Sequence, residues 1–167
     1  MFWIMNMKFK YQWITVIIIA ILSVAALLTK PVLSRYNSWR ANHLICGAHL
    51  FVVRDNARLS LVIKYYLDGT RGVVNYQGML EDGEGAYNVS RAVDLSVSEY
   101  KNMMTVKSTE VTVSPADNAP LRKLRGMFPA AYLEKNKNFN FEVYPQTSEG
   151  YIFSTGNIPS FYCAAMA

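Results

Sequence analysis

The chain has 167 residues, of which 51% are hydrophobic and 17% charged. This length suits one ordinary domain plus an accessory segment and excludes a second sizeable core. The formal net charge is +5, but Lys8, Lys10 and Lys30 all flank one apolar run, which leaves 14 Lys and Arg against 12 Asp and Glu in the rest. So small an excess is no electrostatic footprint for DNA or RNA, and a direct nucleic-acid partner is excluded.

The N-terminal part contains an uncharged stretch, WITVIIIAILSVAALL, at residues 13–28. As a helix it would be about 24 Å long, which is at the short end for crossing a bilayer. Lys30 can extend its charge outward and lengthen the effective span. We therefore expect a transmembrane helix over residues 13–30, between a cytoplasmic tail (1–12) and a connector (31–43). A cleaved signal peptide is the alternative, but bulky leucines follow the alanines where an Ala-x-Ala site would lie.

From residue 44 to 167 the hydrophobic pattern changes to alternation with period two, interrupted by turn residues. In the stretch from Arg58 to Asp68 every second residue is apolar, and Asp68-Gly69 is a hairpin signal. This pattern is typical of an antiparallel all-β domain. It predicts about eight strands, near residues 48–53, 58–68, 70–81, 87–98, 103–114, 138–144, 151–155 and 161–164.

One stretch inside this region has helical instead of strand spacing. Leu121, Leu124 and Phe128 recur at the spacing of one helix face between Ala119 and Pro129. We therefore expect one short amphipathic helix that covers an open end of the sheet. Short connections and one covering helix favour a small closed barrel, because closure removes exposed strand edges.

The two cysteines, Cys46 and Cys163, lie near the two ends of the predicted barrel domain. Closing the barrel would bring them onto neighbouring strands, where a disulfide would be worth about 4–5 kcal/mol in the chain-entropy model. Such a bond persists in an oxidising compartment, which for a bacterium is the periplasm. The alternative is two buried free thiols, since free cysteine packs as a small hydrophobe. With the short N-terminal tail, the disulfide places residues 44–167 in the periplasm.

The sequence offers few residues for catalysis. His43 and His49 are the only histidines, and there is no HExxH, no cysteine cluster and no GxSxG. A metal site or a nucleophile elbow therefore lacks its parts. We expect no catalytic residue, no cofactor and no metal, and the protein is not predicted to be an enzyme.

Arg91 interrupts the apolar face of its strand, between Val89 and Val93. A guanidinium aimed into a barrel needs a partner, because burying an unpaired charge is costly. Two interpretations stay open. One is an internal ion pair, or a bulge that turns the side chain outward. The other is an anionic, mostly apolar ligand in a cavity, lined by Arg91, Tyr65, Tyr87, Phe139 and Phe141.

Several short motifs together resemble the FidL-like membrane proteins of enteric bacteria. They are the N-terminal anchor with Lys8 and Lys10, the segment Cys46-Gly47-Ala48-His49-Leu50, the strand around Val89-Ser90-Arg91, and the end from Phe153 to Cys163. The resemblance covers essentially the whole chain, and its motifs are structural instead of catalytic. FidL-like proteins are similar in arrangement to ToxS and VtrC, the small partners of ToxR-like one-pass transcription regulators.

The resemblance implies a fold and a role. It implies a calycin- or lipocalin-like barrel at the outer side of the inner membrane, which forms a heterodimer with a ToxR-like regulator and helps to form a pocket for a bile-salt-like apolar acid. A ligand that binds the paired form better would shift assembly and so switch transcription. Two alternatives remain: a membrane-anchored carrier of lipids or other apolar molecules, and an envelope assembly scaffold with a solid barrel.

Overall fold

The computed structural model describes the following residues: 16–25, 31–36, 39, 41, 43–100, 103–146, 150–156 and 158–166. The chain separates into two units, residues 1–37 and 38–167. In the first unit, the two described stretches are helical. None of the described helices combines the length and the apolar character that a membrane span needs. The predicted tail (1–12) and both ends of the predicted span (13–15 and 26–30) lie outside the described residues.

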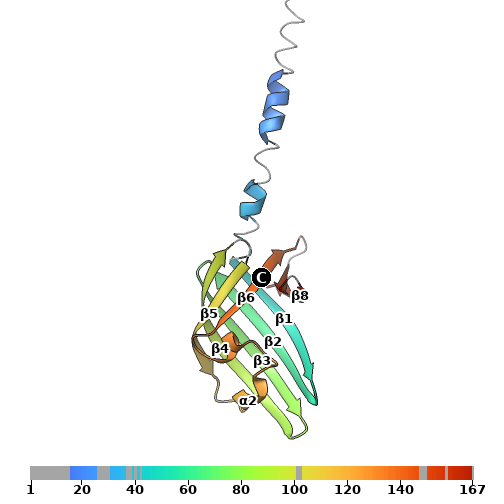
Figure 1. Cartoon of the computed structure of the whole chain (residues 1–167), viewed down its shortest axis with the longest axis vertical. Coiled ribbons are helices and arrows are strands. Elements are labelled where there is room, and N and C mark those ends of the chain that lie inside the picture. Colours follow the sequence, from blue (N-terminus) through green and yellow to red (C-terminus); the bar gives the residue numbers. More distant parts are fainter. Residues whose placement is uncertain are drawn as a thin grey trace, which may run out of the picture. The chain divides into compact units, whose positions relative to one another are not determined.

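The second unit is a closed antiparallel barrel of eight strands in sequence order (Figure 1). The strands are β1 (His43–Arg54), β2 (Ala57–Asp68), β3 (Arg71–Asp82), β4 (Gly85–Tyr100), β5 (Met103–Val113), β6 (Asn138–Pro145), β7 (Gly150–Thr155) and β8 (Ile158–Ala165). The predicted closed barrel of about eight strands is confirmed. Its first strand is longer than predicted and begins at His43 instead of residue 48.

The barrel interior is filled by the apolar residues of each period-two pattern. In β2, Leu61, Ile63 and Tyr65 are buried, whereas the alternating Lys64 is exposed. Successive side chains of a strand point to opposite faces, so one set lines the inside and the other meets water. The hydrophobic core therefore lies along the barrel axis, and each strand pairs with the next strand of the chain.

Gly78 of β3 lies unusually close to the backbone of β2. It pairs with Leu61 on one side and Val89 on the other. A Cβ added at this position would overlap the backbone oxygen of Ser60. Glycine therefore permits a close approach between β2 and β3 that any side chain would prevent.

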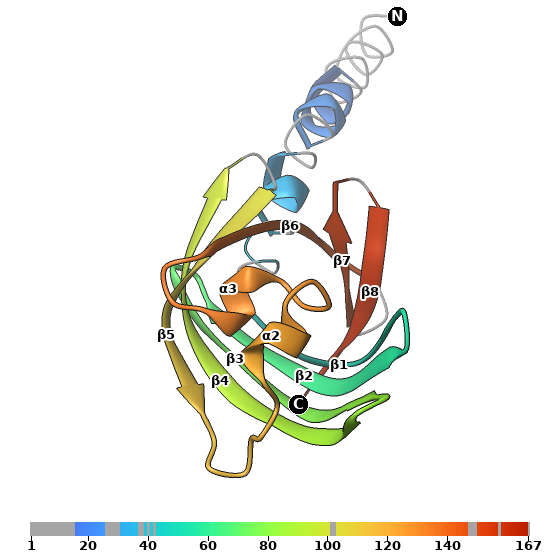
Figure 2. The ribbon, with the colours of Figure 1, turned by 60° about the horizontal axis from the view of Figure 1, so that its bottom comes forward.

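Residues 114–137, here called the covering segment, leave β5 and cross the barrel before β6. They contain two short helices, α2 (Leu121–Leu124) and α3 (Ala130–Leu133), which lie within the ring of strands in Figure 2. The predicted short helix within residues 119–129 is confirmed in part: it is α2, which spans Leu121–Leu124 only, and a second short helix, α3, follows it. Gly126 has a φ of 82°, outside the helical range, and Pro129 lacks an amide hydrogen, so it can begin a helix but not continue one.

The covering segment is attached to the barrel at several points. Lys123 forms ion pairs of 2.5 Å with Asp82 and Glu84 of the β3–β4 hairpin. At the other end, the buried Ser108 hydroxyl donates to the carbonyl of Glu134 at 2.6 Å and accepts from the amide of Lys137 at 3.0 Å. These contacts hold the segment in place across the barrel.

Candidate functional site

An aromatic pocket of about 480 Å³ lies between the covering segment and strands β1, β7 and β8. Its volume falls in the range of small-molecule sites, which are concave and mostly apolar. No Lys, Arg, Asp or Glu is among the lining residues. They are His49, Leu50, Phe51, Val52, Tyr65, Met127, Phe128, Pro129, Tyr132, Phe139, Phe141, Phe153, Thr155, Ser160 and Phe161.

The pocket adjoins the seam at which the barrel closes. β1 pairs with β2 along its whole length, but with β8 at two positions only, Cys46 with Ala165 and Gly47 with Ala164. Among the described residues, no further pair joins the two strands. Leu50 and Phe51 point to opposite faces of β1, and yet both line the pocket. The pocket therefore reaches past the edge of β1 and opens sideways as well as inward.

The disulfide between Cys46 and Cys163 lies at the same seam. Its Cα atoms are 5.5 Å apart, and both cysteines are completely buried. The predicted bond is thus present in the structure, and the described residues include no free cysteine. Only two residue pairs join β1 and β8. The disulfide therefore contributes much of the connection that closes the barrel beside the pocket.

The inner wall of the pocket is a set of packed aromatic rings. Phe153 is central to it: its ring centroid lies 4.8 Å from that of Tyr65, 4.7 Å from that of Phe161 and 5.2 Å from that of Phe141. Ring pairs at such separations stabilise each other beyond the area they bury. The wall is therefore a packed aromatic surface, which is suited to another flat or apolar molecule.

Two tyrosine hydroxyls form the polar part of this inner wall. The hydroxyl of Tyr65 donates to that of Tyr132 at 3.2 Å, and both side chains are buried. The hydroxyl of Tyr76 donates at 2.5 Å to the backbone carbonyl of Tyr132. Burial raises the pKa of Tyr65 and of Tyr132 well above the usual value for tyrosine. Both side chains therefore stay neutral and keep their hydrogens.

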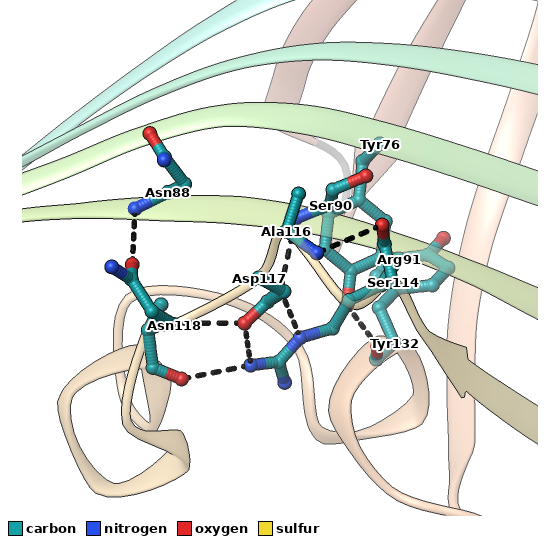
Figure 3. A network of polar contacts seen from close by, with 10 residues as sticks. Tyr76, Asn88, Ser90, Arg91, Ser114, Ala116, Asp117, Asn118 and Tyr132 are labelled. Carbon is teal, nitrogen blue, oxygen red and sulfur yellow. Dashed lines mark hydrogen bonds and ion pairs between the residues drawn. The ribbon is translucent and has the colours of Figure 1, made fainter.

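Arg91 lies elsewhere. Its side chain is buried and forms an ion pair with Asp117 of the covering segment, with Nε 2.8 Å from one carboxylate oxygen (Figure 3). Its Nη2 also donates to the carbonyl of Ala119 at 3.0 Å. The internal ion pair is thus the arrangement that the structure contains, and Arg91 does not line the aromatic pocket.

The Asp117 carboxylate is held by several donors. Besides Arg91, the backbone amides of Ser90 and Ala119 donate to it at 2.8 and 3.1 Å. Burial by itself raises the pKa of Asp117, but the hydrogen bonds from Arg91 and Ser90 outweigh it and lower the pKa below its ordinary value. The hydrogen bond with Asp117 likewise raises the pKa of Arg91. Both groups are therefore charged across the physiological range.

The predicted cavity residues thus divide into two groups. Tyr65, Phe139 and Phe141 line the aromatic pocket together, whereas Tyr87 and Arg91 do not. The Tyr87 ring lies under the Lys123 ammonium, 4.7 Å from its centroid.

Three major pocket residues were not predicted from the sequence: Tyr132, Phe153 and Phe161. The last two lie in predicted strands at alternating positions beside Tyr151 and Cys163, a signal that could have placed them inside the barrel.

The described parts of the chain contain no group of three or more His, Cys, Asp or Glu residues placed to hold a metal ion. His49 is the only lining residue with an imidazole, and Thr155 and Ser160 are the lining residues with an aliphatic hydroxyl. The Ser160 hydroxyl donates to that of Thr155 at 3.2 Å. All three are exposed. The pocket thus has a polar outer end, an aromatic middle and a buried pair of hydroxyls at the inner wall.

A family model described as the YqeJ C-terminal domain matches residues 43–163, which is nearly the whole barrel from the start of β1 to Cys163. No curated protein and no solved structure matches the chain.

Proposed function

The chain belongs to the YqeJ C-terminal domain family, and from the pocket in its barrel we propose that it is a binding protein for an apolar or amphipathic small molecule. The observation that carries this proposal is the pocket of about 480 Å³, lined by aromatic and aliphatic side chains and open at the β1–β8 seam. A small barrel can hold one such ligand between its sheet and a covering element. The architecture of a lipocalin-like carrier is the nearest analogy.

The proposal also includes a membrane anchor and a location of the barrel in an oxidising compartment. Residues 13–28 are uncharged, and the described part of them, residues 16–25, is helical. A buried disulfide between Cys46 and Cys163 suits a periplasmic domain better than a cytoplasmic one. We therefore place the barrel at the periplasmic side of the bacterial inner membrane, on a single N-terminal anchor.

The proposed partner is a ToxR-like one-pass transcription regulator, as the FidL-like resemblance implies. In the described residues no strand pairs with the outer edge of β1 from Ala48 to Arg54. Such an edge offers backbone donors and acceptors to another protein. A regulator domain on this edge would contact both the chain and the mouth of the pocket, so a bound ligand would change the affinity between the two proteins.

The ligand-binding experiment uses the full-length chain in a mild detergent, with cholate below its own micelle concentration as the probe. A Ser160→Trp variant places a large ring at the exposed outer end of the pocket and should weaken binding at least tenfold. The matched control is Ser96→Trp, because Ser96 is an equally exposed serine on β4, outside the pocket. Equal weakening by both variants, or no saturable binding to the wild type, would refute the pocket as the site.

The partner experiment is a pull-down of the full-length chain from its own bacterium, with the bound proteins identified by mass spectrometry. Recovery of a one-pass protein with a cytoplasmic winged-helix domain, in an amount that changes when cholate is added, supports the co-component role. If no regulator is recovered and cholate still binds, the protein is a carrier that works alone. The carrier stays the second candidate because the barrel closes without a strand from another protein.

A further inference from the structure

We propose that the Tyr65 and Tyr132 hydroxyls are the inner recognition site of the pocket and donate a hydrogen bond to a neutral ketone or hydroxyl oxygen on an otherwise apolar ligand. This inference rests on the proposed binding function of the same pocket and specifies the chemistry of its ligand. Two observations carry it: the hydrogen bonding of the tyrosine pair, and the absence of charged groups from the described lining.

The tyrosine pair has one hydrogen more than its contacts use. Tyr65 and Tyr132 carry one hydroxyl hydrogen each, and the 3.2 Å bond between them uses one. In the described part of the chain, neither hydroxyl has another hydrogen-bond partner. The nearby Tyr76 differs, because its hydroxyl donates to a backbone carbonyl. Each side chain of the pair is only 2% exposed, and a buried donor without an acceptor is costly.

Because the tyrosine pair lines the pocket, a bound ligand could accept the remaining hydroxyl hydrogen. Both tyrosines line the pocket, and the rings of Phe153 and Phe139 pack against them at centroid distances of 4.8 and 5.7 Å. The surrounding wall is therefore apolar, and the two tyrosine hydroxyls are the polar groups within it. An oxygen at the leading end of a bound molecule would satisfy the donor.

The lining also indicates that the accepting oxygen is neutral. No Lys or Arg lines the pocket, so a carboxylate at the inner end would lose its hydration without gaining a cationic partner. The polar outer end, with His49, Thr155 and Ser160, is exposed. An amphipathic ligand would therefore keep its charged group at the outer end and insert the end that carries a hydroxyl or ketone.

The test compares two molecules that differ at one position. 2-Acetylnaphthalene and 2-ethylnaphthalene share a ring system and nearly a shape, but only the first has a carbonyl oxygen. Each is titrated into the full-length chain in detergent by calorimetry. The wild type should bind the ketone about tenfold more tightly, the effect of one net hydrogen bond.

The variant Tyr65→Phe, Tyr132→Phe removes both hydroxyls and keeps the rings. It should bind the two naphthalenes equally, with the affinity for the hydrocarbon unchanged. Removing both partners of a hydrogen bond together leaves no unpaired group, so we expect the barrel to fold. Tyr66→Phe is the matched control, because Tyr66 follows Tyr65 but faces outward and does not line this pocket. It should keep the tenfold preference. Titration of both naphthalenes into protein-free detergent corrects for partition into micelles.

Three outcomes would overturn the inference. Equal binding of the two naphthalenes by the wild type would leave the pocket function intact but refute the role of the hydroxyls. A preference that persists in the folded double variant would place the donor elsewhere. Binding of neither naphthalene would refute this inference, whereas the proposed function is refuted only if cholate also fails to bind. The wild-type comparison decides the matter even if the double variant fails to fold.

Discussion

Arg91 and Asp117 form a two-pronged ion pair inside the protein. Nε and Nη2 of the guanidinium donate to the two carboxylate oxygens at 2.8 and 3.0 Å, and the side chains are 5% and 2% exposed. The pair joins the inner face of β4 to the start of the covering segment. The Arg91 charge, which would be costly to bury alone, is thus balanced by Asp117. The ion pair also holds the covering segment, which forms one wall of the pocket, against the barrel.

Replacing Asp117 with asparagine should strongly destabilise the barrel. The change leaves the Arg91 guanidinium buried without a counter-charge, and removing one partner of a buried pair typically costs about 3–5 kcal/mol. Urea unfolding monitored by far-UV circular dichroism would measure the change in the free energy of unfolding, since the three tryptophans, Trp3, Trp13 and Trp39, all precede the barrel. Glu134→Gln is the control, because it breaks an ion pair with an Arg125 side chain that is 60% exposed. It should cost less than about 1 kcal/mol.

If the two variants lost similar stability, the Arg91–Asp117 pair would have no special structural role. A folded Arg91→Met, Asp117→Leu variant with much of the stability restored would, in contrast, support the desolvation argument. Apolar pairs of similar volume often replace buried ion pairs without net loss.

The same carboxylate predicts a loss of stability in acid. The folded-state pKa of Asp117 is lowered, so its contribution is fully present above the unfolded value, about 3.9, and is lost as pH falls below it through the folded value. The free energy of unfolding, measured between pH 7 and 2, should fall below about pH 4 more steeply in the wild type than in Asp117→Asn. Parallel curves for the two proteins would show that Asp117 does not cause the loss of stability in acid.

The period-two pattern predicted the strands because burial of alternate residues is a local property of the sequence. The disulfide could also be inferred, since closing a meander brings its first and last strands together. The ion-pair partner of Arg91 could not be predicted from the sequence. Asp117 lies in the connection between β5 and β6, where no periodic pattern indicates that a carboxylate is buried. The contact between Tyr65 and Tyr132 likewise depends on how the covering segment crosses the barrel. Gly126 and Pro129 are the residues in the sequence that indicate a break in the helix there.

Loss of either cysteine should destabilise the barrel to the same extent. The bond between Cys46 and Cys163 spans a sequence separation of 117 residues, and the chain-entropy model gives about 4–5 kcal/mol for such a loop. Cys46→Ala, Cys163→Ala and the double variant should therefore lose similar stability in urea unfolding. Thiol labelling of the unfolded, non-reduced wild type should detect no free thiol. Unequal single variants, or labelled wild type, would refute a structural disulfide.

Adding one methyl group at Gly78 should disturb the barrel more than adding it at Gly83. At Gly78 the new Cβ would overlap the backbone oxygen of Ser60 and approach Leu61, so β2 and β3 must move apart. Crowding of this kind costs about 1–3 kcal/mol. At Gly83, in the β3–β4 turn, a Cβ would meet nothing within 4 Å, and the change should stay within about 0.5 kcal/mol. Thermal unfolding of Gly78→Ala and Gly83→Ala measures the difference, and equal midpoints would show that the barrel does not depend on the close approach of β2 and β3 at Gly78.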